Sequence, residues 1–313
     1  MAVSSGGTRA PVVVAVDRSG SADDAVDWAA AEAATRGCPL RIVHALHPML
    51  PADPYGVGSP FDSLHAAVAA AEPVLARGVA RARAVVPDIE LTTRLVCGSP
   101  VGILLDEALR AQLLVMGTRE RSGLRARITR SVSFQVAAQA SCPVVVIRPA
   151  RAEDRPGPPR VVVGVDGAST RSPALGFAFQ AARQRGVPLA AVHAWTPGPP
   201  AGLEAVHHPV TTEAVERRAL ERALHRWHAQ YPDVPVVTRL VPADPARAVT
   251  AESHGAALVV VGSGHRGLLT GSLRGSVSRS VLRRTRCPVA IVRDRVDRPA
   301  NRRPRRGFGV GSA

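Results

Sequence analysis

Short apolar runs alternate with longer amphipathic segments along the first half of the chain. The runs are rich in valine, leucine and isoleucine, are too short for helices, and lack the alternation of a half-exposed strand. They are typical of parallel strands that helices cover on both faces. The pattern predicts strands over 12–16, 40–45 and 91–96 and helices over 22–37 and 63–86, after which helix and strand alternate twice more. We therefore expect an α/β fold.

A repeat divides the chain into two halves. The segment VVVAVD ends at Asp17 and VVVGVD ends at Asp166, 149 residues later. CPVVVIR begins at Cys142 and CPVAIVR begins at Cys287, 145 residues later. Such offsets indicate a duplicated domain, and we predict two open twisted five-stranded parallel sheets with helices on both faces. The expected boundaries are 1–150 for the first domain, 151–159 for a linker, 160–294 for the second domain and 295–313 for an Arg/Gly-rich disordered tail.

Composition removes several classes of function. The chain contains no lysine, which excludes a Schiff-base enzyme and a phosphate loop that ends in Gly-Lys-Ser or Gly-Lys-Thr. The formal charge is +15, but residues 293–306 alone contain seven arginines against two aspartates. Blocks of like charge are usually solvated, so we expect binding neither to nucleic acid nor to a membrane.

The cysteines and the amino-terminal segment bear on the compartment. Cys38, Cys97, Cys142 and Cys287 occur singly, so we expect reduced core residues and no disulfide framework. The first apolar run ends before Asp17, and it is too short for the apolar region of a signal sequence. No run approaches the ~18 apolar residues of a transmembrane helix, and we expect a cytoplasmic protein.

Candidate ligand-binding residues gather where the strands end, which is where open parallel sheets bind ligands. Asp17 and Asp166 end the first strand of each half, where a carboxylate can take a ribose hydroxyl or a metal, or cap the following helix. Gly117 and Gly262 end the fourth strand, and the loop after each enters a helix at Ser-Val-Ser. Glycine lets a ligand approach the backbone, and amides at a helix start bind anions, so polyphosphate is the expected guest.

Taken together, these features resemble the universal stress protein family in its tandem form. The resemblance covers Val12 to Arg148 and Arg160 to Arg293, and rests on the strand ending in Asp, the VHA strand, the loop entering Gly-Ser-Val-Ser and the closing CPV strand. It implies an adenine nucleotide alpha-hydrolase-like fold and a stress-response module that binds ATP, with or without Mg²⁺. It also implies that the closing strands, 144–148 and 289–293, pair to make a pseudo-dimer within one chain, and a homodimer of chains is a further expectation.

The family's nucleotide-binding motif is Gly, two residues, Gly, nine residues, Gly and then Ser or Thr. In the second half the matching positions, with the residue that follows, are Gly262, His265, Gly275, Ser276 and Val277. In the first half they are Gly117, Glu120, Arg130, Ser131 and Val132. Two of the three glycines are present in the second half and one in the first, so we expect nucleotide binding in the second half rather than in the degenerate first half.

The resemblance also assigns residues outside this loop. It places Asp17 and Asp166 in contact with the nucleotide, and Ala45 and Ala194 against the adenine. No catalytic residue and no metal ligand follows from it.

Two other functions stay open at this point. One is a slow ATP hydrolase in which Asp166 holds the metal on the triphosphate and His265 activates water. The other is a scaffold that binds no nucleotide and only dimerises. Equal and negligible phosphate release by the wild type and by His265→Ala would exclude hydrolysis.

Three further signals have ordinary explanations. Gly262, Gly264 and Gly267 spell GxGxxG, but the acidic residue of a dinucleotide-binding fold does not follow. His225 and His228 lack a third metal ligand, so an exposed helix face is expected there. His44 and His193 lie among apolar residues and are expected to be satisfied core histidines.

Overall fold

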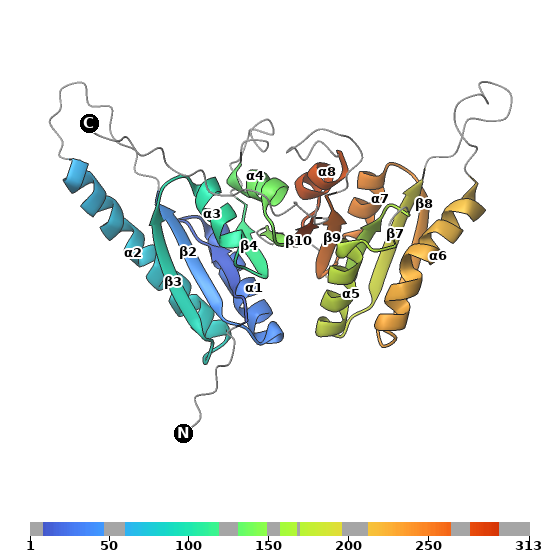
Figure 1. Cartoon of the computed structure of the whole chain (residues 1–313), viewed down its shortest axis with the longest axis horizontal. Coiled ribbons are helices and arrows are strands. Elements are labelled where there is room, and N and C mark those ends of the chain that lie inside the picture. Colours follow the sequence, from blue (N-terminus) through green and yellow to red (C-terminus); the bar gives the residue numbers. More distant parts are fainter. Residues whose placement is uncertain are drawn as a thin grey trace, which may run out of the picture.

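The structure is a computed structural model that describes residues 9–46, 60–118, 131–148, 157–167, 170–195, 212–263 and 276–293. The first half contains β1 (Val12–Ala15), α1 (Gly20–Arg36), β2 (Leu40–Leu46), α2 (Pro60–Val85), β3 (Leu91–Cys97), α3 (Pro100–Ala108), β4 (Leu113–Gly117), α4 (Val132–Gln139) and β5 (Val144–Ile147). The second half contains β6 (Val161–Val165), α5 (Pro173–Arg185), β7 (Leu189–Trp195), α6 (Glu213–Gln230), β8 (Val236–Pro242), α7 (Pro245–Glu252), β9 (Leu258–Gly262), α8 (Ser276–Arg284) and β10 (Val289–Val292). The alternation of strand and helix is the predicted one (Figure 1).

The strands form one sheet that runs through both halves. Its order is β3-β2-β1-β4-β5-β10-β9-β6-β7-β8, and the pairs within each half are parallel. In the middle, β5 and β10 pair antiparallel, with Val145 opposite Ala290. The predicted pairing of the closing strands is confirmed, and the two five-stranded halves lie side by side across it (Figure 1).

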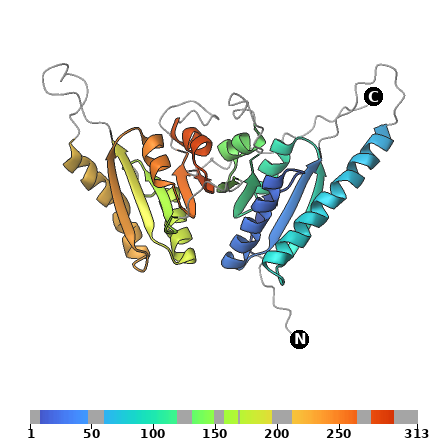
Figure 2. The same ribbon diagram turned by 180° about the vertical axis from the view of Figure 1, so that it is seen from behind.

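Each face of the sheet has its own apolar layer, because successive strand residues point to opposite faces. Val12 and Val14 belong to the layer beneath α1, α2, α5 and α6, whereas Val13 belongs to the layer beneath α3, α4, α7 and α8. In the view of Figure 2, α1 and α2 lie in front of the strands of the first half. All three valines are fully buried, as expected of parallel strands covered on both sides.

The first helix of each half ends on an equivalent glycine. Gly37 after α1 has φ +58°, and Gly186 after α5 has φ +62°. This left-handed conformation is costly for residues with a Cβ atom, and its amide closes the last helical turn. The duplicated sequence therefore folds with the same helix stop in both halves.

An ion-pair cluster joins α1 of the first half to α5 of the second. Glu32 is buried on α1, and its Oε1 accepts a 2.7 Å hydrogen bond from Nε of Arg36. Its Oε2 accepts a 2.5 Å bond from Nη2 of Arg185 on α5. The guanidinium of Arg36 lies 5.4 Å from the ring centre of Phe177, and that of Arg185 lies 5.5 Å from the ring centre of Trp28. Each half thus contributes one arginine to an aromatic ring of the other half.

One expectation about the cysteines is wrong. Cys142 is buried, and this burial raises the pKa of its thiol to about 12. Cys97, at the end of β3, is exposed rather than part of the core. The reason is that β3 is an edge strand, so its apolar run is covered on fewer sides than the runs of the inner strands.

Candidate functional site

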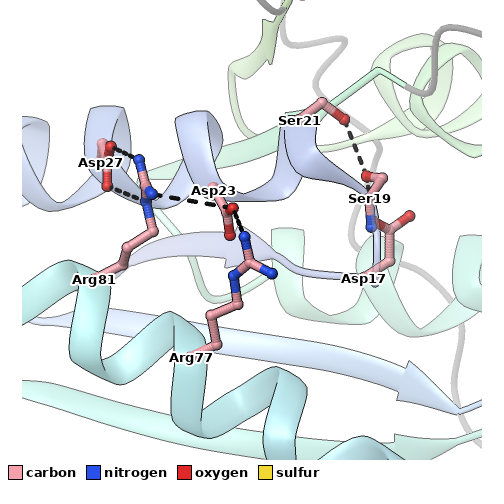
Figure 3. Close-up of polar contacts among 7 residues, drawn as sticks. All are labelled: Asp17, Ser19, Ser21, Asp23, Asp27, Arg77 and Arg81. Atoms are coloured by element: carbon pink, nitrogen blue, oxygen red, sulfur yellow. Dashed lines mark hydrogen bonds and ion pairs between the residues drawn. The ribbon is translucent and has the colours of Figure 1, made fainter.

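The first strand of each half ends in an aspartate at the carboxyl edge of the sheet. Oδ1 of Asp17 accepts hydrogen bonds from the Ser19 amide, at 2.8 Å, and from the Ser19 hydroxyl. The Ser19 hydroxyl lies 3.0 Å from that of Ser21 (Figure 3). Ser19 takes the N-cap position of α1, and Ser172 takes that of α5. Serines that follow the aspartates therefore occupy the N-cap positions, although neither serine side chain makes a capping hydrogen bond.

A histidine of the second strand holds the backbone before each aspartate. Nδ1 of His44 lies 2.7 Å from the carbonyl oxygen of Val16, and Nδ1 of His193 lies 2.8 Å from that of Val165. A carbonyl oxygen can only accept, so Nδ1 carries the hydrogen in both rings. His193 is buried and His44 is half-buried, which agrees with the expected satisfied histidines.

Strand register brings together the residues that were predicted to contact the ribose and the adenine. In the second half, Asp166 and Ala194 are the next residues after the last pair of β6 and β7, so they lie beside one another. In the first half, the pairing of β1 and β2 ends at Ala15 and Val43, and the same register continued by two residues sets Asp17 opposite Ala45. The four residues therefore form one matched pair at the edge of each half-sheet.

The two strand-end glycines have different surroundings. A Cβ atom on Gly117 would lie 2.5 Å from the carbonyl oxygen of Ser21, in the first turn of α1. A Cβ atom on Gly262 would meet Ala174 at an ordinary 3.7 Å among the described residues. Gly117 is thus required by packing between helix and strand, whereas packing of the described residues makes no such demand on Gly262.

The cause of this difference is the start of the helix above each glycine. Helix α1 begins at Gly20, whose equivalent in the repeat is Ser169, whereas α5 begins four residues later at Pro173. Proline is favoured in the first turn of a helix, which fits the later start. Thr170, the residue equivalent to Ser21 in the repeat, precedes α5 instead of lying in its first turn.

The predicted phosphate-binding residues are described only in part. Gly275, His265 and Arg130 lie outside the described residues. Ser131 precedes α4 at the N-cap, where its hydroxyl accepts from the Phe134 amide at 3.3 Å, and Val132 begins the helix. Ser276 and Val277 form the start of α8.

Sequence reasoning missed the role of the second serine in the Ser-Val-Ser of α8. The hydroxyl of Ser278 donates a 2.9 Å hydrogen bond to the carbonyl oxygen of Gly262. This bond holds the first turn of α8 against the end of β9. The repeated Ser-Val-Ser was the available signal, but its spacing alone does not show which backbone group the hydroxyl meets.

A hollow of about 260 Å³ opens beside Asp17 in the first half, between α1 and α2. Val16, Val26 and Val74 give it apolar walls, and Arg77 lies at its rim. On the same two helices, Arg77 pairs with Asp23 and Arg81 pairs with Asp27 (Figure 3). These ion pairs clamp α2 to α1. The four-residue spacing within each helix was the sequence signal for them.

The described part of the chain bears on two other kinds of site, a metal centre and a membrane-spanning helix. There, no group of three or more His, Cys, Asp or Glu residues is arranged to hold a metal ion. His225 and His228 are exposed on α6, as expected, and the ring of His228 meets that of Phe179 edge-on at 5.9 Å. No helix within the described ranges has the length and apolar character needed to span a membrane.

Comparisons with known proteins all match the same family over most of the chain. The model of the universal stress protein family matches twice, over residues 8–148 and 158–293. Universal stress protein Rv2005c of Mycobacterium tuberculosis is 36% identical over 293 residues, covering 90% of this chain and 96% of its own. Universal stress protein Rv2623 of the same organism is 34% identical over 302 residues, covering 93% of this chain and 99% of its own.

A solved structure agrees with the fold. The crystal structure of a universal stress protein from Archaeoglobus fulgidus aligns with a TM-score of 0.67 at 19% identity, covering 90% of this chain and 96% of that chain. The chain belongs to the universal stress protein family, in a form with two tandem domains.

Proposed function

We propose that the second domain binds an adenine nucleotide, ATP with or without Mg²⁺, and that the first domain binds it weakly or not at all. The observation that carries the proposal is the contrast between the two strand-end glycines. Ser21 in the first turn of α1 fills the space above Gly117, whereas the late start of α5 leaves Gly262 with ordinary contacts among the described residues.

Each part of the nucleotide has a chemically suited partner in the second domain. The carboxylate of Asp166 accepts hydrogen bonds from ribose hydroxyls, and Ala194 beside it offers a small apolar contact for the base. The start of α8 presents amide groups and the positive end of the helix dipole to the phosphates. Ser278 fixes that helix start against Gly262, which pre-orders the amides.

The sequence supports the same preference between the domains. The second domain has glycine at Gly262 and Gly275, whereas Arg130 stands at the first domain's last glycine position. Glycine there allows a phosphate to approach the backbone more closely than a longer residue does. Cellular location and any homodimer stay expectations from the sequence.

A matched pair of variants of the full chain tests the proposal. We expect Asp166→Asn to weaken ATP binding by about tenfold or more, since a charged acceptor of hydrogen bonds is lost. Asp17→Asn, the equivalent change in the first domain, should leave the affinity of this site unchanged. Calorimetric titration of ATP measures both. Equal effects of the two variants, or a larger effect of Asp17→Asn, would contradict the assignment to the second domain.

A further inference from the structure

The buried His193 makes a second contact that its counterpart in the first domain does not show among the described residues. Its Nδ1 hydrogen goes to the Val165 carbonyl, and its Nε2 lies 2.7 Å from Oε2 of Glu216 on α6. The hydrogen bond described for His44 is the one to Val16. The second domain thus has a link from the end of β6, through an imidazole, to the first turn of α6.

The same ring also packs against the residue after Asp166. Gly167 has φ +70°, and a Cβ atom there would lie 3.0 Å from Cε1 of His193 and 3.4 Å from Cβ of Ala219 on α6. Gly167 therefore lies close against both the ring and the helix. In the first domain the equivalent position is Arg18, whose guanidinium instead reaches the carbonyl oxygen of Ala70 at 3.4 Å.

These contacts hold the residues on either side of Asp166 in the chain. The residue before it is held through its carbonyl by His193, and the residue after it is packed against the same ring. Glu216, 20% exposed, fixes the ring from the other side. We propose that His193 and Glu216 are positioning residues for Asp166, holding its backbone in the conformation that binds the nucleotide. This inference rests on the proposed function of the second domain.

The proton arrangement gives the proposal a distinctive signature. Nδ1 must donate to the carbonyl, so a proton between Nε2 and Glu216 is also needed, either on the ring or on the carboxyl group. The proposal therefore predicts that a side chain at position 216 that can pair with Nε2 keeps the contact, whereas one that cannot loses it.

Among the described residues, few polar or charged groups lie close to the ring of His193. Glu216 on α6 is the charged group within hydrogen-bond distance of the His193 ring. From β6 the ring meets the Val165 carbonyl, and Asp166 follows directly after the end of that strand. On β8, the strand paired with β7, the residue opposite His193 is the uncharged Leu240. The signature is therefore expected to depend on Glu216.

The test is calorimetric titration of ATP into the full chain and into two variants of Glu216. Glu216→Ala should bind about tenfold more weakly than the wild type, the effect of losing one hydrogen bond to a charged group. Glu216→Gln should restore most of the affinity, because its amide can donate to a neutral Nε2.

A control lies one turn away on the same helix. Glu213 is exposed and pairs with Arg217, so Glu213→Gln should bind ATP as the wild type does. Circular dichroism confirms that each variant is folded. Wild-type affinity in Glu216→Ala would overturn the positioning role while leaving the proposed function intact. Absence of ATP binding by the wild type would overturn both.

Discussion

Replacing Glu32 by alanine should lower the free energy of unfolding by about 3 kcal/mol, because it leaves two arginines without their shared buried carboxylate. The side chain of Glu32 is 3% exposed, and it bonds to Arg36 of its own helix and to Arg185 of the second domain. The loss should be visible in denaturant unfolding of the full chain. It should also separate the unfolding of the two domains into two transitions, since the cluster joins them.

The repeat supplies a rescue experiment for this variant. The position equivalent to Glu32, 149 residues later, is Ala181 on α5, and it is fully buried. Arg36 and Arg185 are themselves equivalent by the same offset. A glutamate moved to 181 would stand four residues before Arg185, as Glu32 stands before Arg36. We therefore expect Glu32→Ala combined with Ala181→Glu to recover part of the lost stability.

An exposed acidic residue serves as the control for this prediction. Glu213 pairs with Arg217 on α6, and both side chains are more than half exposed. Because exposed pairs contribute little, Glu213→Ala should change the unfolding free energy by at most about 0.5 kcal/mol. A loss in Glu32→Ala no greater than in Glu213→Ala would show that the cluster does not hold the domains together.

Gly117→Ala should destabilise the first domain by about 1 to 3 kcal/mol, the usual cost of forcing extra volume into a packed site. The new Cβ atom would lie 2.5 Å from the carbonyl oxygen of Ser21 and 2.7 Å from its carbonyl carbon. Those are backbone atoms of α1, so relief requires the helix to move. Thermal unfolding of the full chain measures the effect.

Gly262→Ala is the matched variant in the second domain. Its Cβ atom would meet Ala174 at 3.7 Å, an ordinary contact, so we expect little loss of stability there. If Gly262→Ala destabilised the chain as much as Gly117→Ala, the space proposed for the nucleotide would be filled by protein.

The strands were predictable because their apolar runs are continuous and recur at fixed offsets. All predicted boundaries in the first half lie within three residues of the observed ones. The pairing of β5 with β10 was expected from the family resemblance alone, since nothing in two valine-rich segments specifies their partners, and its antiparallel direction was not predicted. Cys97 shows the limit of the pattern, since an apolar run does not reveal which strand lies at the edge.

The contacts between the two domains, and those in which the domains differ, were not predictable from the repeat. The offset makes Trp28 equivalent to Phe177 and Arg36 equivalent to Arg185, but it does not show that these residues cross between the halves. The close approach of Ser21 to Gly117 likewise depends on where α1 begins, and a helix start is set by local capping as well as by sequence equivalence. Such contacts arise from tertiary packing.

Native mass spectrometry of the full chain with ATP, recorded as nucleotide is added, tests the central claim most directly. We predict that one ATP per chain binds at low concentration and that a second appears only at much higher concentration. Two ATP molecules bound with equal affinity, or none at any concentration, would contradict a nucleotide site that is confined to the second domain.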